Sequence, residues 1–304
     1  MTLPISGPAH RPLIGVFLML GAMTVLPGID VIAKQLGRDG LPILQIVWGR
    51  LALGAVMALP LALRAGGGGA LWPDRPAYHA LRAAFLAAAT FTFFLSLTYL
   101  PIASALAIFF VQPLIVTVLS ALVLKERVGP RRWSAVAVGF VGTLIIIRPG
   151  VVEVNPGSLL ALAAGTLLAC YFVLTRAIAG RAPAVVTTFQ TSLIGGALLS
   201  LAVPFVWHPP TSGQWAMLVA LAFIATFGHL LIVKAYDHAE ASLLAPLAYT
   251  EMVTSVIMGW VFFRDFPDMW TFVGVAILIG CALYISMRER AAGRMPVPEG
   301  IEQP

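Results

Sequence analysis

The chain has 304 residues, of which 60% are hydrophobic and only 11% are charged, with a formal net charge of +6. A soluble domain carries about 25% charged residues, so this composition excludes an ordinary soluble protein and indicates a polytopic membrane protein. The positive residues lie in loops between apolar runs, so the net charge does not predict a nucleic-acid partner. Both cysteines, Cys170 and Cys281, lie inside apolar runs, which predicts packing residues rather than a disulfide or a metal site.

Apolar segments of membrane-spanning length follow one another along the whole chain. A helical span needs about 20 mostly apolar residues. In chain order, the predicted spans are 12–35, 43–63, 78–99, 103–124, 132–148, 157–177, 184–206, 214–236, 241–263 and 269–287. Basic residues precede the first segment, as in a signal peptide, but no small-residue cleavage pattern follows it, so it is interpreted as a span. We therefore expect an all-α integral membrane protein with ten transmembrane helices.

The distribution of basic residues predicts the orientation of these spans. Arg50 lies within the second span, and only Lys34, Arg38, Arg148 and Arg264 fall on the face opposite the termini. All other Lys and Arg residues fall on the face that carries both termini, and basic residues are enriched in cytoplasmic loops. We therefore expect both termini, including a tail at 288–304, in the cytoplasm of a bacterial-type inner (plasma) membrane.

The two halves of the chain resemble each other. The run "ASALAIFFVQPLIVTVLSALVLKERVGPRRWSAVAVGFVG" matches "ASLLAPLAYTEMVTSVIMGWVFFRDFPDMWTFVGVAILIG" in the second half. The pattern Gly54-x-x-x-Ala58 also matches Gly196-x-x-x-Ser200, and such small-residue spacing lets helices approach closely. Each repeat holds five spans, so the second must be inverted in the membrane relative to the first. We expect repeats at 12–148 (spans 1–5) and 157–287 (spans 6–10), with a substrate site between them near the bilayer midplane.

Three stretches carry a resemblance to a known family. They are "QIVWGRLALGA" in span 2, "SLTYLPIASALAIFFVQPLIVTVLSALVLKERV" across spans 3 and 4, and "APLAYTEMVTSVIMGWVFFRDFPDMWTFVGVAILIGCALYISMRER" at the end. The chain resembles the drug/metabolite transporter superfamily, specifically ten-span EamA-type transporters with two EamA repeats. Glu126 fits the family's acidic residue after span 4, whereas Arg264-Asp265 stands where the family usually has Gly-Glu. The resemblance implies a secondary carrier; subgroups export amino acids or import riboflavin or S-adenosylmethionine.

Ionisable side chains inside the predicted spans are the main site candidates, because burying a charge in a membrane costs about 2.5–3.5 kcal/mol on insertion scales. Glu251 lies near the midpoint of span 9, where a carboxylate would contact substrate, carry a proton or pin two helices. Arg50 in span 2 could bind an anionic group through its planar guanidinium or serve packing alone. Asp30 follows Pro27-Gly28, which should bend span 1, and it could pair with Arg50.

Further candidates are polar or aromatic. His229 lies well inside span 8, as a packing residue or a proton carrier. Gln112 stands beside the first-half counterpart of Glu251. Trp48 and Tyr249 could stack on a planar ligand, as could Phe109, Phe110, Tyr171 and Phe172; aromatic residues in spans are also commonly packed or lipid-facing.

The function predicted from these features is a secondary active transporter that moves a small polar metabolite by alternating access. No nucleotide motif is present, so proton coupling or exchange would supply the energy, and we expect no cofactor and no metal. One alternative, from the resemblance, is an importer of a planar vitamin or nucleoside-like metabolite. A second alternative is an intramembrane enzyme, but the sequence contains no H-E-x-x-H, G-x-S-x-G or P-loop motif. A third alternative is a channel or a scaffold. A continuous pore usually needs repeated polar stripes or a ring of subunits, and the sequence shows neither. Substrate, transport direction and oligomeric state stay open.

Overall fold

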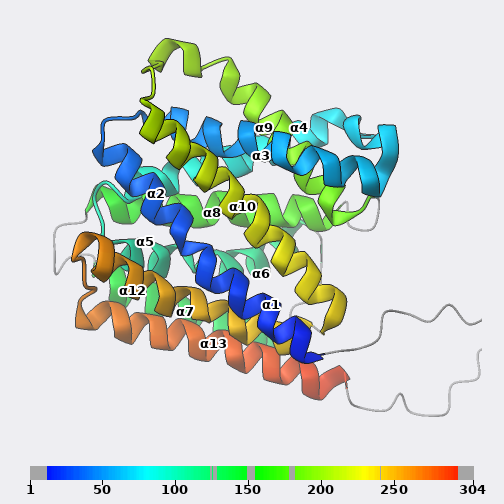
Figure 1. Cartoon of the computed structure of the whole chain (residues 1–304). Helices are drawn as coiled ribbons and strands as arrows, with labels where there is room; N and C mark the ends of the chain where they lie inside the picture. The colour runs from blue at the N-terminus through cyan, green and yellow to red at the C-terminus, as the bar shows by residue number, and fades with distance from the viewer. Residues whose placement is uncertain are drawn as a thin grey trace, which may run out of the picture.

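The computed structural model describes residues 12–123, 125, 129–148, 155–177, 182–239 and 241–293, which form the helical bundle of Figure 1. Its elements are α1 (Pro12–Val25), α2 (Pro27–Arg38), α3 (Ile43–Gly66), η1 (Gly67–Leu71), α4 (Pro76–Ser96), α5 (Ile102–Phe109), α6 (Gln112–Val123), α7 (Pro130–Ile147), α8 (Pro156–Ala177), α9 (Ala184–Ser200), η2 (Val203–Val206), α10 (Ser212–His238), α11 (Ala241–Leu244), η3 (Ala245–Tyr249), α12 (Thr250–Phe263) and α13 (Met269–Gly293). Every regular element in these ranges is helical. Glu126 and residues 294–304 lie outside the described residues.

The apolar helices match the ten predicted spans. Among the described residues, six segments are long and apolar enough to cross a membrane: Pro12–Arg38, Ile43–Gly69, Pro76–Ser96, Ile102–Val123, Pro156–Thr175 and Ser212–Ala235. Four shorter apolar helices, Trp133–Ile147, Val185–Ser200, Leu247–Phe263 and Met269–Cys281, occupy the other four predicted positions. The prediction of an all-α membrane protein is therefore confirmed, while the last helix continues to Gly293, past its predicted end at residue 287.

Three of the predicted spans are interrupted, each beside a proline. Span 1 divides at Leu26 into α1 and α2, which confirms the predicted bend at Pro27-Gly28. Span 4 divides between Phe109 and Gln112, just before Pro113, and span 9 consists of α11, η3 and α12, with Pro246 in η3. Proline cannot donate the backbone hydrogen bond that continues a helix. The sequence predicts only the first interruption, and residues 103–124 and 241–263 were expected to be continuous spans.

The principal packing pairs join the first half of the chain (α1–α7) to the second half (α8–α13). Helix α1 packs on α10, α3 on α9, α4 on α8, and α7 on α13 (Figure 1). In span numbers these pairs are 1 with 8, 2 with 7, 3 with 6, and 5 with 10, a set that is unchanged when the halves are exchanged. We infer that the halves are two copies related by inversion, as the odd number of spans per repeat requires.

Small residues permit the closest of these approaches. A Cβ atom on Gly196 of α9 would lie 3.1 Å from the Cα and N atoms of Ala52 on α3. A Cβ atom on Gly15 of α1 would lie 2.5 Å from the Cβ of Ala239, just beyond α10. Glycine at these points lets two backbones meet without a side chain between them, as the small-residue spacing around Gly196 predicted.

The bundle has two ends, which we call the terminal end and the distal end. The terminal end is where α1 begins at Pro12 and α13 ends at Gly293, and the distal end is where α2 ends at Arg38 (Figure 1, right and left). The loop between α3 and α4 and the beginning of α9 lie at the terminal end. The orientation predicted from the basic residues would place the terminal end in the cytoplasm.

Candidate functional site

A cavity of about 310 Å³ lies at the centre of the bundle. Residues from α2, α3, α4, α5, α8, α9, α10 and α12 line it, so both halves of the chain contribute to its wall. This volume lies at the lower end of the range of small-molecule pockets, about 300–1,000 Å³. The cavity therefore has the size and the shared wall expected of a carrier's substrate site between two repeats.

Four ionisable residues predicted from the sequence meet at this cavity. Asp30 comes from α2, Arg50 from α3, His229 from α10 and Glu251 from α12. Arg50 is an electrostatic neighbour of Asp30 and His229, and Asp30 is one of Glu251, so the four ionisable groups form one cluster. Helices from opposite halves thus bring together residues that are more than 200 positions apart in the sequence.

Local structure explains where the first-half members of this cluster point. The interruption at Leu26 begins a new helix at Pro27, and Asp30 lies buried in the first turn of that helix. Arg50 is half-buried, and its Nη1 donates a hydrogen bond to the Oγ1 of Thr90 on α4 at 2.7 Å. Arg50 makes this bond instead of the direct ion pair with Asp30 that the sequence analysis considered. Arg50 therefore lines the cavity while its Nη1 is held by Thr90.

The second-half members of the cluster, His229 and Glu251, have different surroundings. The Nδ1 of His229 lies 2.8 Å from the carbonyl oxygen of Ala225, one turn earlier in α10. Because a carbonyl oxygen only accepts, this contact requires a proton on Nδ1, and in the neutral imidazole Nε2 is then a hydrogen-bond acceptor. Glu251 is half-buried in the first turn of α12, directly after the irregular η3 segment. That break in the helix positions the carboxylate at the cavity.

The remaining predicted site residues lie elsewhere. Trp48 donates from Nε1 to the Oγ of Ser200 at 2.9 Å and packs edge-on against Trp207, with ring centroids 5.7 Å apart. The ring of Tyr249, in η3, packs against Phe110 at a centroid distance of 5.6 Å. None of these aromatic residues lines the central cavity.

Gln112 also stands outside the cavity wall. It begins α6, next to the interruption of span 4, and its buried Oε1 has no hydrogen-bond partner among the described residues. The cavity-binding roles considered for Gln112, Trp48 and Tyr249 therefore have no support in the wall of this cavity, and they stay predictions.

Several cavity residues were not singled out by the sequence analysis. Thr90, Thr188, Thr191 and Ser192 provide hydroxyl groups, and Phe93 and Phe94 add to the predicted aromatic residues Phe109, Tyr171 and Phe172 in the wall. Thr90 stands in the apolar run "LAAATFTFF", where a hydroxyl is the only polar signal. A threonine hydroxyl can donate a hydrogen bond to a backbone carbonyl of its own helix, so its presence in a span does not predict a site.

Contacts between the halves close the distal end above this cavity. The Nζ of Lys34 at the end of α2 donates to the Oδ2 of Asp265 at 2.7 Å and to the carbonyl oxygen of Leu100 at 2.9 Å. Lys34, which the basic-residue distribution places on the side opposite the termini, is buried at this end. The side chain of Gln45 donates to the carbonyl of His208 at 2.8 Å and accepts from its backbone N–H at 3.0 Å. The bonds to Asp265 and His208 tie α2 and α3 to loops of the second half, and the bond to Leu100 ties α2 to the segment between α4 and α5.

A further distal contact lies at the start of α13. Asp268 accepts hydrogen bonds from the backbone N–H and the hydroxyl of Thr271, each at 2.8 Å, and forms an ion pair with Arg148. Burial works to raise the pKa of Asp268, but the bonds from Thr271 and Arg148 outweigh it and hold this pKa below its usual value. Asp268 therefore caps α13 as a carboxylate and links it to the end of α7.

The fold and the cavity together define an integral membrane protein of the carrier type, with a substrate-sized cavity shared by two similar halves. Residues 13–148 and 155–287 each match the EamA-like transporter family. The chain belongs to this family and is a membrane transporter. These two matched segments also correspond to the halves between which the central cavity lies.

Individual relatives and a solved structure are similar over almost the whole chain. An S-adenosylmethionine uptake transporter of Rickettsia prowazekii is 28% identical over 86% of this chain and 88% of its own. A riboflavin transporter of Vibrio cholerae is 29% identical over 94% and 97%, and a pseudopaline exporter of Pseudomonas aeruginosa is 26% identical over 88% and 94%. A solved crystal structure matches with a TM-score of 0.62 over 92% of this chain and 97% of that chain; at 21% identity it shows the shared fold.

Proposed function

We propose that the protein is a secondary transporter that carries a small polar metabolite across a bacterial-type inner membrane by alternating access, with both termini in the cytoplasm. The observation that carries this proposal is the central cavity of about 310 Å³, in which Asp30, Arg50, His229 and Glu251 converge from both halves. Charged groups inside a membrane bundle are costly and commonly mark a substrate or ion pathway. Rocking of one half against the other would expose this cavity to each side in turn.

The charges of the cavity favour a ligand that carries both signs. Asp30 and Glu251 offer two carboxylates that can bind an ammonium or another cationic group. Arg50 offers a planar guanidinium that suits a carboxylate or phosphate, and its bond to Thr90 holds it in place. A zwitterionic metabolite would offer a partner to both the carboxylates and the guanidinium, whereas an uncharged one would offer an ion pair to neither.

A second candidate substrate class is a planar vitamin or a nucleoside-like metabolite. Its support is the aromatic part of the wall, formed by Phe93, Phe94, Phe109, Tyr171 and Phe172. Aromatic rings bind planar ligands by stacking, which contributes binding energy without hydrogen bonds. The relatives named as S-adenosylmethionine and riboflavin transporters make these two compounds the natural probes.

Coupling to protons would use the carboxylate of Glu251. It lies in the cavity wall at the break of span 9, and its electrostatic neighbour Asp30 lies on the opposite half. A carboxylate that gains and loses a proton during the cycle would change the charge of the cavity, and therefore its affinity, between the two faces. Exchange of one substrate for another is the alternative source of energy, and it would need no proton.

The test is transport by the purified protein in liposomes. Labelled S-adenosylmethionine, riboflavin and a set of amino acids would be supplied with and without a pH gradient. We expect one class to accumulate or to exchange, and a pH gradient to increase accumulation if protons are coupled. Failure to move any compound of a broad metabolite panel would contradict the proposed function.

Two substitutions test the assigned roles. Glu251→Gln should abolish accumulation against a gradient while the protein still folds, whereas Asp39→Asn, at an exposed carboxylate bonded to Gln35, should transport as wild type. Arg50→Lys keeps the positive charge but loses the planar guanidinium and its paired N–H donors, and it should weaken binding of an anionic probe by about tenfold or more. Wild-type accumulation by Glu251→Gln would remove Glu251 from the mechanism.

A further inference from the structure

Arg82 in α4 is the largest side chain that the described part of the bundle buries completely, with an exposed fraction of 0%. Its Nη2 donates to the carbonyl oxygen of Thr187 at 2.7 Å and to the hydroxyl of Thr191. Its Nε and Nη1 have no hydrogen-bond partner among the described residues. Burying a guanidinium whose N–H groups are not all hydrogen-bonded costs free energy, so we infer a role for Arg82 beyond packing. The distribution of basic residues had placed Arg82 on the face that carries both termini.

Arg82 stands between two hollows. Thr191 and Tyr171 line the central cavity, and the Arg82 guanidinium lies 5.5 Å from the centroid of the Tyr171 ring. Thr187 lines a second pocket of about 200 Å³ at the terminal end, and so does His79, one turn before Arg82 on α4. The guanidinium therefore occupies the layer between the central cavity and this terminal pocket.

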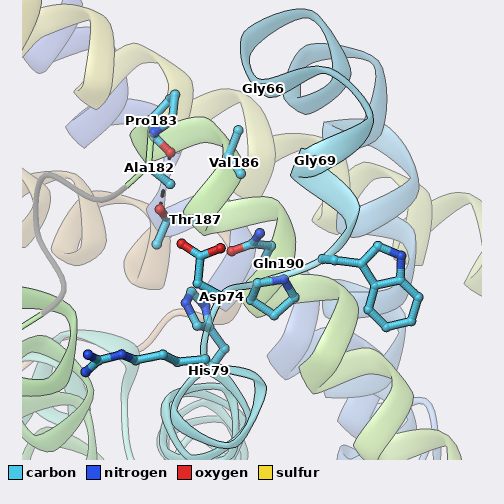
Figure 2. Close-up of a pocket in the computed structure, with 12 residues that line it drawn as sticks. Gly66, Gly69, Asp74, His79, Ala182, Pro183, Val186, Thr187 and Gln190 are labelled. Atoms are coloured by element: carbon cyan, nitrogen blue, oxygen red, sulfur yellow. Dashed lines mark hydrogen bonds between the residues drawn. The ribbon is translucent and has the colours of Figure 1, made fainter.

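The terminal pocket lies directly beyond that layer. Figure 2 shows it between the loop that leads into α4 and the first turns of α9, with the carboxylate of Asp74 pointing toward Thr187 and Gln190. On α9 the terminal pocket is lined by Thr187 and Gln190 and the central cavity by Thr188, Thr191 and Ser192, so the two hollows meet along neighbouring faces of this helix, and Arg82 bonds one residue from each lining. A molecule that moved from the central cavity to this pocket would pass the guanidinium of Arg82.

The contacts of Arg82 cross from one half to the other. Arg82 belongs to α4 in the first half, whereas Thr187, Thr191 and Tyr171 belong to α9 and α8 in the second. Tyr78, one turn earlier, also donates from its hydroxyl to the carbonyl of Leu174 on α8, at 3.1 Å. Any movement of one half against the other must change these bonds.

We propose that Arg82 closes the passage between the central cavity and the terminal pocket, and that its bonds to α9 must break when the carrier opens toward the terminal end. This inference rests on the alternating access of the proposed function and adds a positioning residue to it. In the open state, Nε and Nη1 can donate to oxygen atoms of the passing molecule or of water. The closure at the distal end by Lys34 and Asp265 is its counterpart on the other face.

The experiment measures how fast a cysteine in the cavity reacts with a membrane-impermeant maleimide. The reporter is Ser192→Cys, which lies on the cavity wall one position from Thr191, in a chain carrying Cys170→Ala and Cys281→Ala. Reagent added from the terminal side should label the reporter about tenfold faster in Arg82→Gln, because hydrogen bonds to a charged group contribute at least that factor to the closed state. Labelling from the distal side should not rise.

Matched variants separate gating from general disruption. Arg75→Gln removes an exposed guanidinium from the wall of the same terminal pocket, and its labelling rate should equal that of the parent chain. Arg82→Lys retains one donor toward the Thr187 carbonyl and should give an intermediate rate. Thr191→Val removes the hydroxyl acceptor from the other side of the bond, and it decides the question if Arg82→Gln does not fold.

Equal rates in Arg82→Gln, Thr191→Val and Arg75→Gln would overturn the proposal, as would an equal rise from both sides of the membrane. The assay requires no substrate. A protein that shows the expected labelling pattern but transports nothing would therefore contradict the proposed function and leave the gate in place.

Discussion

The contact between α7 and α13 offers a sharp test of backbone packing in this bundle. A Cβ atom added to Gly274 would lie 2.3 Å from the Cγ1 of Ile146 and 2.6 Å from the carbonyl oxygen of Gly142. The carbonyl belongs to the helix backbone and cannot rotate away, so Gly274→Ala must push the two helices apart. A Cβ atom added to Gly280, on the same helix, would meet no atom of the described residues within 4 Å, so Gly280→Ala serves as the control.

The expected difference in melting temperature can be worked out because both substitutions replace a helical glycine by alanine. Each gains about 1 kcal/mol of helix propensity, and this gain cancels between the two variants. Only Gly274→Ala incurs the overpacking cost of roughly 1–3 kcal/mol. At about 2–4 °C per kcal/mol, Gly274→Ala should melt ~2–12 °C below Gly280→Ala in detergent.

The assay is a thermal melt of both purified variants in the same detergent, followed by binding of a transported probe below both transitions. No described residue of α7 or α13 lines the central cavity, so the two variants should bind the probe equally. Equal melting temperatures would refute the close approach of α7 and α13. A loss of binding in folded Gly274→Ala would show that this contact shapes the cavity.

Two further predictions concern bonds that hold the closed state and the site. Asp265→Asn leaves the buried ammonium of Lys34 with a neutral partner and should lower the free energy of unfolding by about 1–3 kcal/mol, read as a lower melting temperature; an unchanged value would show that the pair contributes little. Thr90→Val removes the acceptor of Arg50 and should weaken binding of S-adenosylmethionine or riboflavin, whichever is transported, by about tenfold. The control is Thr92→Val, at a hydroxyl bonded to its own helix, and equal affinities of the two variants would exclude a positioning role for Thr90.

The spans themselves were predictable because the bilayer imposes their length and requires every backbone group in it to be bonded within the helix. The interruption at Pro27 was equally local, since a proline removes a helical hydrogen bond wherever it stands. The interruptions in spans 4 and 9 have the same cause, yet prolines also occur inside continuous helices, as Pro60 does in α3. Whether such a proline ends a helix depends on neighbours that can compensate the lost bond.

The cost of a buried charge made Asp30, Arg50 and Glu251 identifiable, and their depth suggested a pair of Asp30 with Arg50, but it did not predict which other side chains line the same cavity. Tyr249 is two positions from Glu251 and was also a candidate, yet it packs on Phe110 outside the cavity. The direction of each side chain depends on the irregular turn of η3, which no periodicity in the sequence records. The same holds for Thr90, whose partner Arg50 lies on another helix.

The sequence by itself determined that this chain crosses a membrane as two similar sets of five apolar helices, and which charges are too costly to be accidental. Hydropathy and charge are properties of single residues and of their spacing, so they can be read from the sequence without the folded structure. Only the tertiary structure decided which of those charges share a cavity and that Arg82 is buried. That depends on α4, α8 and α9 closing over one guanidinium, and contacts between distant helices have no signature along the chain.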